Sequence, residues 1–268
     1  MKKKKPLKNS DKNKIAAPRV GLARALSKMG YCSRSEAAEL VRAGRVRLNG
    51  SLTRNPEAPV RLGKDRVAVD GAPVEAGVKI CFVMNKPRGV VTTAADEKGR
   101  DTVYTLLPAD APWVGPVGRL DMASEGMLLL TNDSEWAARV SAPETHLQKI
   151  YHVKISVVAD AELVRELEAG FAVKDGEVLR VSRAEILRCG EKNSWLEIVL
   201  EEGKNRQIRR MFEARDVEVL RLIRVAIGPL ALADLAKGQC RVLAPTEKLA
   251  IDLAIRRGMK RIPKKDGM

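Results

Sequence analysis

The sequence predicts an α+β fold in two domains, flanked by basic tails. With 268 residues, the chain has room for one large or two modest domains. Two short helical patterns followed by short strands fit within residues 20–75, whereas from residue 80 onwards apolar runs mix with helical segments. Strands and helices do not alternate regularly there, which argues against a doubly wound parallel sheet. We therefore expect a small domain over residues 20–75 and a larger domain over residues 80–253.

Helical spacing and capping signals predict the elements of the small domain. Apolar residues recur at helical spacing over residues 20–29, and Gly30 supplies a stop. A capping box formed by Ser33 and Glu36 begins a second helix, which ends at Gly44. Two strands follow, each closed by a turn pair: residues 45–48 with Asn49-Gly50, and residues 66–69 with Asp70-Gly71.

Continuous apolar runs predict the buried strands of the larger domain, and helical spacing predicts its helices. No internal repeat and no Gly-rich phosphate loop is present, which disfavours a nucleoside triphosphatase. The expected strands are residues 80–84, 127–130, 150–158 and 195–200, and the expected helices are residues 134–140, 160–168, 205–215 and 246–256.

The charge of the chain favours a polyanionic partner. Lys and Arg number 49 against 34 for Asp and Glu, which gives a formal net charge of +15. Much of the excess lies in the tails, with eight basic residues and one acidic residue in residues 1–19, and six and one in residues 256–268. We expect these tails to be solvated and to add a salt-dependent background to nucleic-acid binding.

Composition excludes several classes of protein. No uncharged run reaches the length of about 18 residues that a membrane span requires, and the Lys-rich start does not lead into an apolar signal sequence. The four cysteines are far apart without a Cys-x-x-Cys pair, and only two histidines occur, so no metal site is expected. We expect a cytoplasmic protein whose acid–base chemistry depends on carboxylates.

The small domain carries dispersed cations and one aromatic residue, Tyr31, so it cannot be a base-stacking platform. Phosphate contacts fit it better. Residues 30–37, 42–46 and 49–50, read together, resemble the S-four-type RNA-binding domain. The candidate RNA-binding residues are Arg24, Lys28, Arg34, Arg42, Arg45 and Arg47.

The loop at residues 118–126, Gly-Arg-Leu-Asp-Met-Ala-Ser-Glu-Gly, leads directly into a predicted core strand. An Arg two residues before an Asp is common by chance, and in isolation it indicates a surface ion pair. At this position the Asp121 carboxylate would be partly desolvated and would need a cationic partner to stay ionised. Asp121 is therefore a candidate catalytic group.

Two further segments carry candidate site residues. Four cations occur in a segment of seven residues at the start of a predicted helix: Lys204, Arg206, Arg209 and Arg210. A solvated basic helix is the simpler interpretation, but guanidinium groups suit phosphates and carboxylates held in fixed geometry. Tyr151 shares one strand face with apolar residues, which places its ring in the interior. Core packing alone would also explain that ring.

Together these segments resemble the RsuA-type family of ribosomal RNA pseudouridine synthases. The resemblance extends from about residue 19 to residue 250. It includes residues 85–90, 118–133, 149–151, 202–211 and 227–230, the last of these as a closing strand. One departure is Met122, which stands where a charged or polar residue is more usual. The resemblance implies a mixed, mainly antiparallel β-sheet with flanking helices as the catalytic domain.

The resemblance also implies roles for individual residues. Members of the family detach a uracil base from its ribose, rotate it and rejoin it through carbon, and they need no cofactor. Asp121 matches the carboxylate that acts on the ribose, either as a nucleophile at the anomeric carbon or by removing the adjacent ribose proton. Arg209 matches the guanidinium that pairs with this carboxylate, and Tyr151 the ring that stacks on the base. The implied substrate-binding residues are Arg119, which takes the place of the flipped uridine, Leu120, Lys86, Arg206 and Arg210.

The expected partner is ribosomal RNA or a ribosome assembly intermediate, bound by a monomer without membrane contact. One alternative is an RNA-binding or assembly factor that keeps this scaffold without catalysis, but Asp121, Tyr151 and Arg209 are intact. A deaminase or a methyltransferase is disfavoured because zinc-ligand spacing and a Gly-rich cofactor loop are missing.

Overall fold

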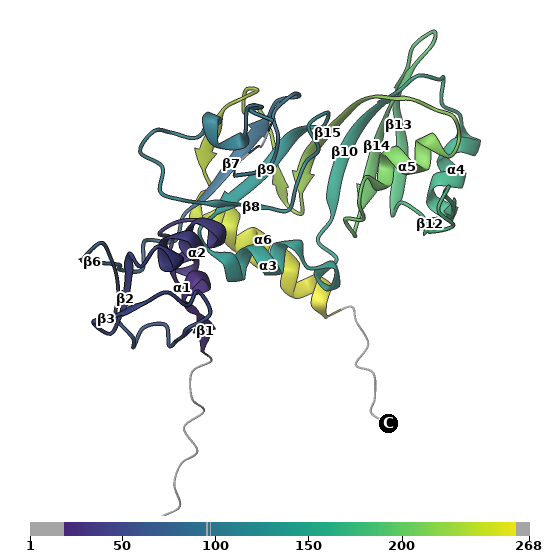
Figure 1. Ribbon diagram of the computed structural model, residues 1–268. Helices are drawn as coiled ribbons and strands as arrows, with labels where there is room; N and C mark the ends of the chain where they lie inside the picture. The colour runs from purple at the N-terminus through teal and green to yellow at the C-terminus, as the bar shows by residue number, and fades with distance from the viewer. Residues whose placement is uncertain (1–18, 95, 97, 261–268) are drawn as a thin grey trace, which may run out of the picture. The chain divides into compact units, whose positions relative to one another are not determined.

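The computed structural model describes residues 19–94, 96 and 98–260, which form two compact units (Figure 1). Within the described residues, the first unit comprises residues 19–29 and 34–75. The second unit comprises residues 30–33 and 76–260.

The predicted basic tails lie largely outside the described residues, at positions 1–18 and 261–268. The C-terminal boundary of the prediction is wrong for residues 256–259, which form the last turn of helix α6 (Pro245–Met259). The helix continues because Ile255 and Gly258 are buried, and Gly258 lies against the backbone of Thr145.

The first unit combines two helices with short strands. Leu22 and Leu26 of helix α1 (Leu22–Lys28) and Val41 of helix α2 (Arg34–Arg42) are fully buried. The strands form an antiparallel sheet of order β3-β2-β5-β6 and a separate pair of β1 with β4. Their bounds are Val20–Gly21 (β1), Val46–Leu48 (β2), Ser51–Thr53 (β3), Pro59–Val60 (β4), Val67–Val69 (β5) and Ala72–Pro73 (β6).

The two hairpin turns of this unit confirm the turn prediction. Asn49 and Asp70 both have φ of 51°, and Gly50 and Gly71 both have φ of 85°. Two successive left-handed residues make the turn whose twist matches that of the paired strands. Asn and Asp tolerate the first of these positions and Gly the second, so local sequence is enough to place β2–β3 and β5–β6.

The second unit is built on a nine-stranded sheet of order β13-β14-β10-β15-β9-β7-β17, with β16 paired to β15 and β8 to β9 (Figure 1). Of these pairings, β9 with β15 is parallel and the others are antiparallel, as the resemblance implies. The bounds are Cys81–Lys86 (β7), Gly115–Val117 (β8), Glu125–Thr131 (β9), Lys149–Ile155 (β10), Arg183–Cys189 (β13), Ser194–Leu200 (β14), Val219–Ile227 (β15), Leu230–Ala231 (β16) and Cys240–Val242 (β17).

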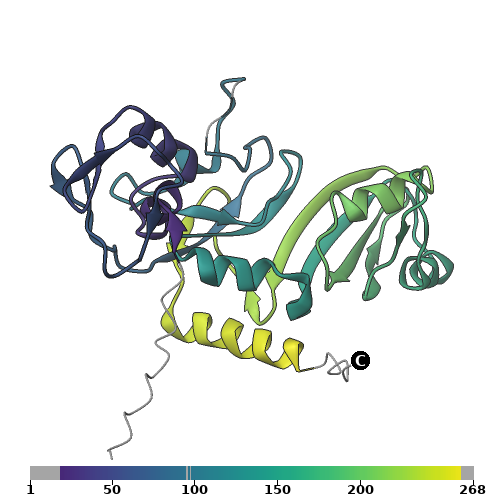
Figure 2. The same cartoon turned by 60° about the horizontal axis from the view of Figure 1, so that its bottom comes forward.

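Helices and loops cover the sheet on both faces. Helices α3 (Ser134–Ser141) and α6 pack against alternate residues of β7 and β9, and the intervening residues of those strands pack against the 90–120 segment. Burial on both faces explains why β7 and β9 are continuous apolar runs. Helices α4 (Ala161–Ala169) and α5 (Gln207–Glu213) pack on β10 and β14 (Figure 2). Shorter elements are Val103–Leu106 (η1), Pro143–Thr145 (η2), Phe171–Ala172 (β11) and Val178–Leu179 (β12).

Most predicted elements are present, but some differ in their bounds and some strands were not predicted. Strand β10 ends at Ile155, before the predicted end at residue 158. Helix α5 starts at Gln207 because Arg206 is left-handed, with φ of 47°. Strands β13 and most of β15 were not predicted. Arginines interrupt the apolar pattern of β15, and one of them, Arg224, is buried with its Nε donating to Met127 O at 2.7 Å.

The parallel contact between β9 and β15 requires glycine at position 126. Gly126 has φ of +100°, and a Cβ there would lie 2.3 Å from Arg224 O. We expect Gly126→Ala to lower the free energy of unfolding by about 2–5 kcal/mol, measured by denaturant titration, because it combines backbone strain with a clash.

A matched control is Gly238→Ala in the same unit. Gly238 also has positive φ (+77°), but its nearest neighbour, Leu106 Cδ2, would lie 4.0 Å from the added Cβ. This variant should lose only about 1 kcal/mol, the cost of the backbone conformation. Equal losses in the two variants would contradict the role of the close β9–β15 approach.

Candidate active site

The Asp121 loop, defined here as residues 118–124, is held from below by a buried lysine. The Lys86 side chain is fully buried, and its Nζ donates to Pro87 O at 3.0 Å, Asp121 O at 3.2 Å and Ser124 O at 2.9 Å. Three acceptors match the three N–H donors of an ammonium group. The Lys86 side chain is used to fix the backbone at this loop, and the expectation that it binds substrate stays a prediction.

Burial lowers the pKa of Lys86 to about 8, although the nearby Asp121 and Glu125 carboxylates raise it. Glu125, which follows the loop, is buried and is held by two cations: Arg221 Nη2 at 2.9 Å and Lys237 Nζ at 2.7 Å. The pKa of Glu125 is about 2, because these hydrogen bonds and charges outweigh the effect of burial, which raises it. The base of the loop thus combines a buried cation with an ionised carboxylate.

The cation that contacts the Asp121 carboxylate is Arg206. Its Nη1 lies 3.2 Å from Asp121 Oδ2, and the Asp121 side chain is 31% exposed. The sequence-based expectation assigned this contact to Arg209, and that assignment is not what the structure contains. Arg206 occupies the position because it precedes α5 in a left-handed conformation, with φ of 47° and ψ of 30°.

Arg209 instead ties together the starts of the two parallel strands. Its Nη2 donates to Ala123 O at 3.1 Å, just before β9, and its Nη1 to Val219 O at 3.4 Å, the first residue of β15. The pKa of Arg209 is lowered by burial and by the neighbouring charge of Arg206, while Asp121 raises it. Arg209 therefore adds positive potential near Asp121 without forming an ion pair with it.

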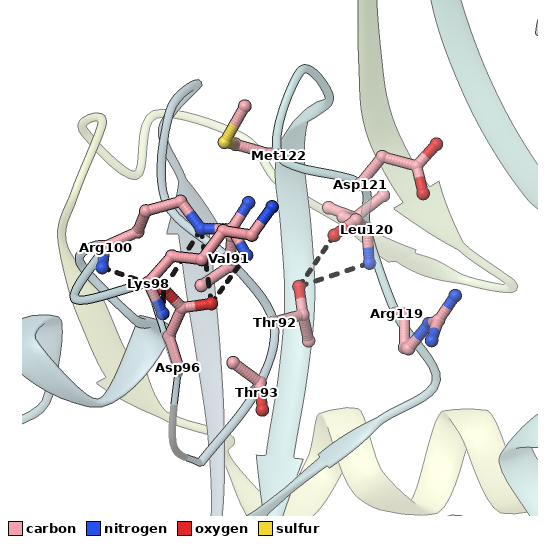
Figure 3. A pocket seen from close by; sticks show the side chains of 10 residues that line it. All are labelled: Val91, Thr92, Thr93, Asp96, Lys98, Arg100, Arg119, Leu120, Asp121 and Met122. Atoms are coloured by element: carbon pink, nitrogen blue, oxygen red, sulfur yellow. Dashed lines mark hydrogen bonds and ion pairs between the residues drawn. The ribbon is translucent and has the colours of Figure 1, made fainter.

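A cleft opens beside the Asp121 loop (Figure 3). Thr92 Oγ1 donates to Leu120 O at 2.7 Å, which fixes the loop to the opposite wall. Leu120 is buried, and Arg119 is exposed at the edge of the cleft. The lining residues are Val91, Thr92, Thr93, Asp96, Lys98, Arg100, Arg119, Leu120, Asp121 and Met122.

Sequence reasoning missed the cations on the far wall of this cleft. Lys98 and Arg100 are exposed, and Arg100 Nη2 is paired with Asp96 Oδ1 at 2.6 Å. The only signal in the sequence was a cluster of charged residues, which is common on protein surfaces. Their position beside Asp121 depends on how the loop folds back over the sheet.

Tyr151 lies between two parts of the core. Its ring is half-buried and packs against the cluster under α5 and also against the cluster that contains Leu120. The expectation of a ring in the interior is met only in part, because Tyr151 is half-buried. A half-buried aromatic ring is suited to stacking on a planar base.

Arg210 faces away from Asp121. Its Nη2 lies 2.6 Å from Asp175 Oδ2 and 2.8 Å from Glu177 Oε2, and both carboxylates belong to the turn between β11 and β12. Two carboxylates thus pair with this guanidinium in the structure, and the expected substrate contact of Arg210 stays a prediction.

The candidate RNA-binding residues of the first unit differ in availability. All of them except Lys28 are strongly exposed. Arg45 is paired with Asp70, Arg34 lies 3.7 Å from Glu57, and Arg47 donates to Gly50 O at 3.1 Å. Arg34 and Arg42 line one shallow pocket of this unit. Exposed guanidinium groups on α1 and α2 are suited to phosphate contacts.

Within the described part of the chain, no group of three His, Cys, Asp or Glu residues is arranged to hold a metal ion. In the same part, no helix combines the length and the apolar character that crossing a membrane would require.

Comparison with known proteins agrees with this geometry. Residues 80–214 match the family of RNA pseudouridylate synthases, and residues 20–67 match the S4 domain. Ribosomal large subunit pseudouridine synthase B of Bacillus subtilis (strain 168) is 36% identical over 228 residues, covering 84% of this chain and 93% of that protein. The chain belongs to the RNA pseudouridylate synthase family.

Other relatives extend this result. An uncharacterized RNA pseudouridine synthase of Aquifex aeolicus (strain VF5) is 35% identical over 241 residues, covering 90% of this chain and 96% of that protein. A crystal structure of a pseudouridylate synthase superposes with a TM-score of 0.61 at 25% identity, covering 87% of this chain and 99% of that chain. The synthase therefore matches its relatives over both units and not only over the Asp121 loop.

The depressed pKa of Lys86 predicts a pH window for its effect on stability. The unfolded chain holds this proton up to about pH 10.5, whereas the folded chain releases it near pH 8. Between these values the unfolded state binds more protons, so stability rises with pH. We expect the free energy of unfolding of the wild type, relative to Lys86→Met, to rise by up to about 3 kcal/mol across this window.

Denaturant titrations at several pH values measure this difference. Lys174→Met is the control, because the Lys174 side chain is 71% exposed, and its difference from the wild type should stay flat over the same range. A flat difference for Lys86→Met as well would contradict the assignment of a buried, weakly basic lysine under the Asp121 loop.

Proposed function

We propose that this synthase converts a uridine of ribosomal RNA into pseudouridine, with the Asp121 carboxylate acting on the ribose. The observation that carries the proposal is the ion pair between Asp121 and Arg206 at 3.2 Å, on a loop that Lys86 holds at the edge of an open cleft. Ribosomal RNA as the substrate is supported by the name of the Bacillus subtilis relative.

The chemistry requires an ionised oxygen in a fixed place. The bond between uracil N1 and ribose C1′ breaks, the base turns, and a bond forms from C5 to C1′. C5 then loses its proton and N1 carries one in the product, so no atom is gained or lost overall. Asp121 can attack C1′ directly or remove the C2′ proton, and either role needs a carboxylate. Arg206 contacts the carboxylate directly, and Arg209 adds positive potential nearby.

The remaining residues around the cleft are suited to holding a flipped nucleotide. We assign base stacking to Tyr151, occupation of the vacated stack to Arg119, and an apolar wall to Leu120. Lys98 and Arg100 lie on the opposite wall, where exposed cations can contact the phosphates next to the target. We further propose that the chain acts as a monomer in the cytoplasm, on ribosomal RNA or on an assembly intermediate.

Asp121→Asn tests the proposed chemistry. The change keeps the shape of the side chain and removes the charge, so pseudouridine formation at saturating RNA should fall by about a thousandfold or more. RNA affinity should stay close to that of the wild type, because many cations and few carboxylates contribute to binding.

Asp110→Asn is the matched control, since Asp110 is exposed in a loop away from the cleft lining. It should react at the wild-type rate. Near-normal turnover by Asp121→Asn would refute the catalytic assignment and would favour a chain that binds RNA without modifying it.

The cations of the first unit generate a prediction about binding. Replacing Arg24 and Arg42 together by Gln should weaken binding to structured ribosomal RNA. It should also flatten the plot of log affinity against log salt, by roughly 0.7–0.9 for each phosphate that the protein no longer neutralises. Filter binding at several salt concentrations measures this slope.

Arg61→Gln is the control in the same unit. Arg61 Nη2 is already paired with Asp65 Oδ1 at 3.0 Å, so its loss should change the slope less. An unchanged slope in the Arg24 and Arg42 double variant would show that α1 and α2 do not contact phosphates.

A further inference from the structure

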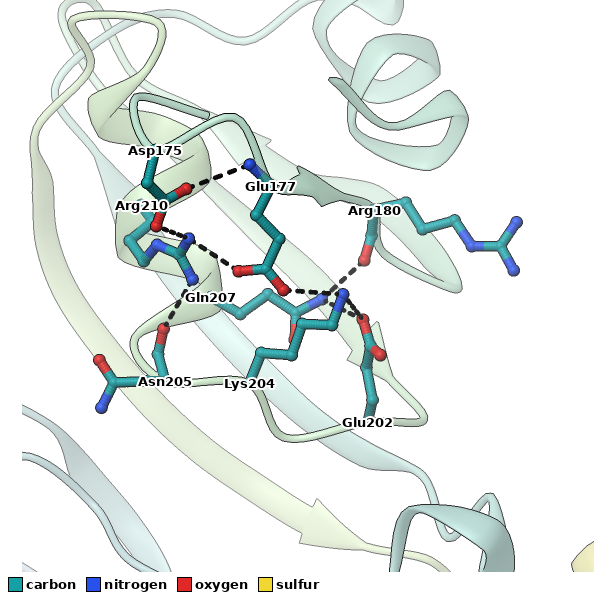
Figure 4. A network of polar contacts seen from close by, with 8 residues as sticks. All are labelled: Asp175, Glu177, Arg180, Glu202, Lys204, Asn205, Gln207 and Arg210. Atoms are coloured by element: carbon teal, nitrogen blue, oxygen red, sulfur yellow. Dashed lines mark hydrogen bonds and ion pairs between the residues drawn. The ribbon is translucent and has the colours of Figure 1, made fainter. Parts of the chain in front are cut away.

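A polar network joins the turn between β11 and β12 to the segment that precedes α5 (Figure 4). Glu177 is its central member. Its two carboxylate oxygens contact different cations: Lys204 Nζ at 3.1 Å and Arg210 Nη2 at 2.8 Å. Asp175 adds a second contact to Arg210 at 2.6 Å. A single carboxylate thus bridges a residue before Arg206 and a residue after it.

The neighbours of Arg206 on the chain are fixed by further contacts. Gln207 is buried, and its Nε2 donates to Arg180 O at 2.8 Å and to Glu202 Oε1 at 3.1 Å. Lys204 Nζ also lies 3.5 Å from Glu202 Oε1. Residues on both sides of Arg206 are therefore anchored to the β11–β12 turn, to Arg180 just after β12, or to Glu202 just after β14.

Arg206 itself takes no part in this network. It has left-handed φ and ψ angles, which a non-glycine residue keeps only where its surroundings determine the backbone. Its side chain leaves the segment toward the Asp121 loop and forms the ion pair at 3.2 Å. The residues that the network holds, Lys204 and Gln207, lie on either side of this unusual conformation.

The charges in the network are matched. Hydrogen bonding from Arg210 lowers the pKa of Glu177, and hydrogen bonding to Glu177 raises the pKa of Lys204. Both groups are consequently charged at the pH at which such an enzyme is assayed. Glu177 is not among the residues that line the cleft, so any effect on the reaction must pass through the segment it holds.

We propose that Glu177 is a positioning residue, which holds Lys204 and Arg210 so that the segment between them presents Arg206 to Asp121. This inference rests on the proposed catalytic role of Asp121. Glu177 acts at a distance from the substrate, so its effect should appear in turnover and depend on Arg206 being present.

The test is a double-mutant cycle on pseudouridine formation with ribosomal RNA. Glu177→Gln should lower kcat by about tenfold with KM changed less than about twofold, since the anchoring charge is lost and the cleft is not. Arg206→Gln should lower kcat at least as much. The double variant should match Arg206→Gln alone, because Glu177 acts through Arg206.

Two further variants complete the cycle. Lys204→Gln removes the other partner of the Glu177–Lys204 ion pair and should reproduce the kcat loss of Glu177→Gln. It keeps the inference testable if Glu177→Gln folds poorly. Glu213→Gln breaks a separate ion pair between α5 and the same turn, with Lys174 at 3.2 Å, and should keep wild-type kcat. Thermal unfolding of each variant confirms that the comparison is between folded proteins.

Two outcomes would overturn the inference. One is wild-type kcat in both Glu177→Gln and Lys204→Gln, and the other is a double variant in which the two single effects multiply. Either result combined with an inactive Asp121→Asn would leave the proposed function intact. An active Asp121→Asn would instead refute the proposed function, whatever the cycle gives.

Discussion

The parallel pairing of β9 with β15 is the constraint on which the rest of the second unit depends. It joins two antiparallel parts of the sheet through only two residue pairs, one of which is Gly126 opposite Arg224. The backbones approach so closely that a side chain at Gly126 would collide with Arg224 O. Because the strands are parallel, the segments that precede them meet at the same edge of the sheet. Those segments are the Asp121 loop and the end of α5.

The Asp121 loop is held mainly through its backbone carbonyls, which accept hydrogen bonds from cations. Arg209 connects Ala123 O to Val219 O across the starts of the two strands, and Lys86 binds three carbonyls from beneath. Such contacts fix the position of the loop whatever its side chains are. The Asp121 carboxylate is thereby left available for a cation, Arg206. Lys86 and Arg209 therefore position the loop backbone, whereas Arg206 pairs with the Asp121 carboxylate.

Local sequence was informative wherever a structure depends on neighbours along the chain. Both faces of β7 and β9 are buried, so these strands are continuous apolar runs in the sequence. The Asn49-Gly50 pair specifies a hairpin turn by its own backbone preferences. Strand β15 was harder to identify, because Arg221 and Arg224 interrupt its pattern. One is paired with Glu125 and the other is buried against Met127 O, and both partners lie about a hundred residues earlier.

The sequence by itself determined the two-unit α+β organisation, the Asp121 loop as the candidate centre of chemistry, and a cluster of four cations in residues 204–210. Only the tertiary structure decided which of these cations faces the carboxylate. Arg206 does so because its backbone is left-handed, while Arg210 is turned toward Asp175 and Glu177 and Arg209 toward the strand ends. A residue type states which contacts a side chain can make, but the direction of that side chain is set by distant groups that hold its backbone.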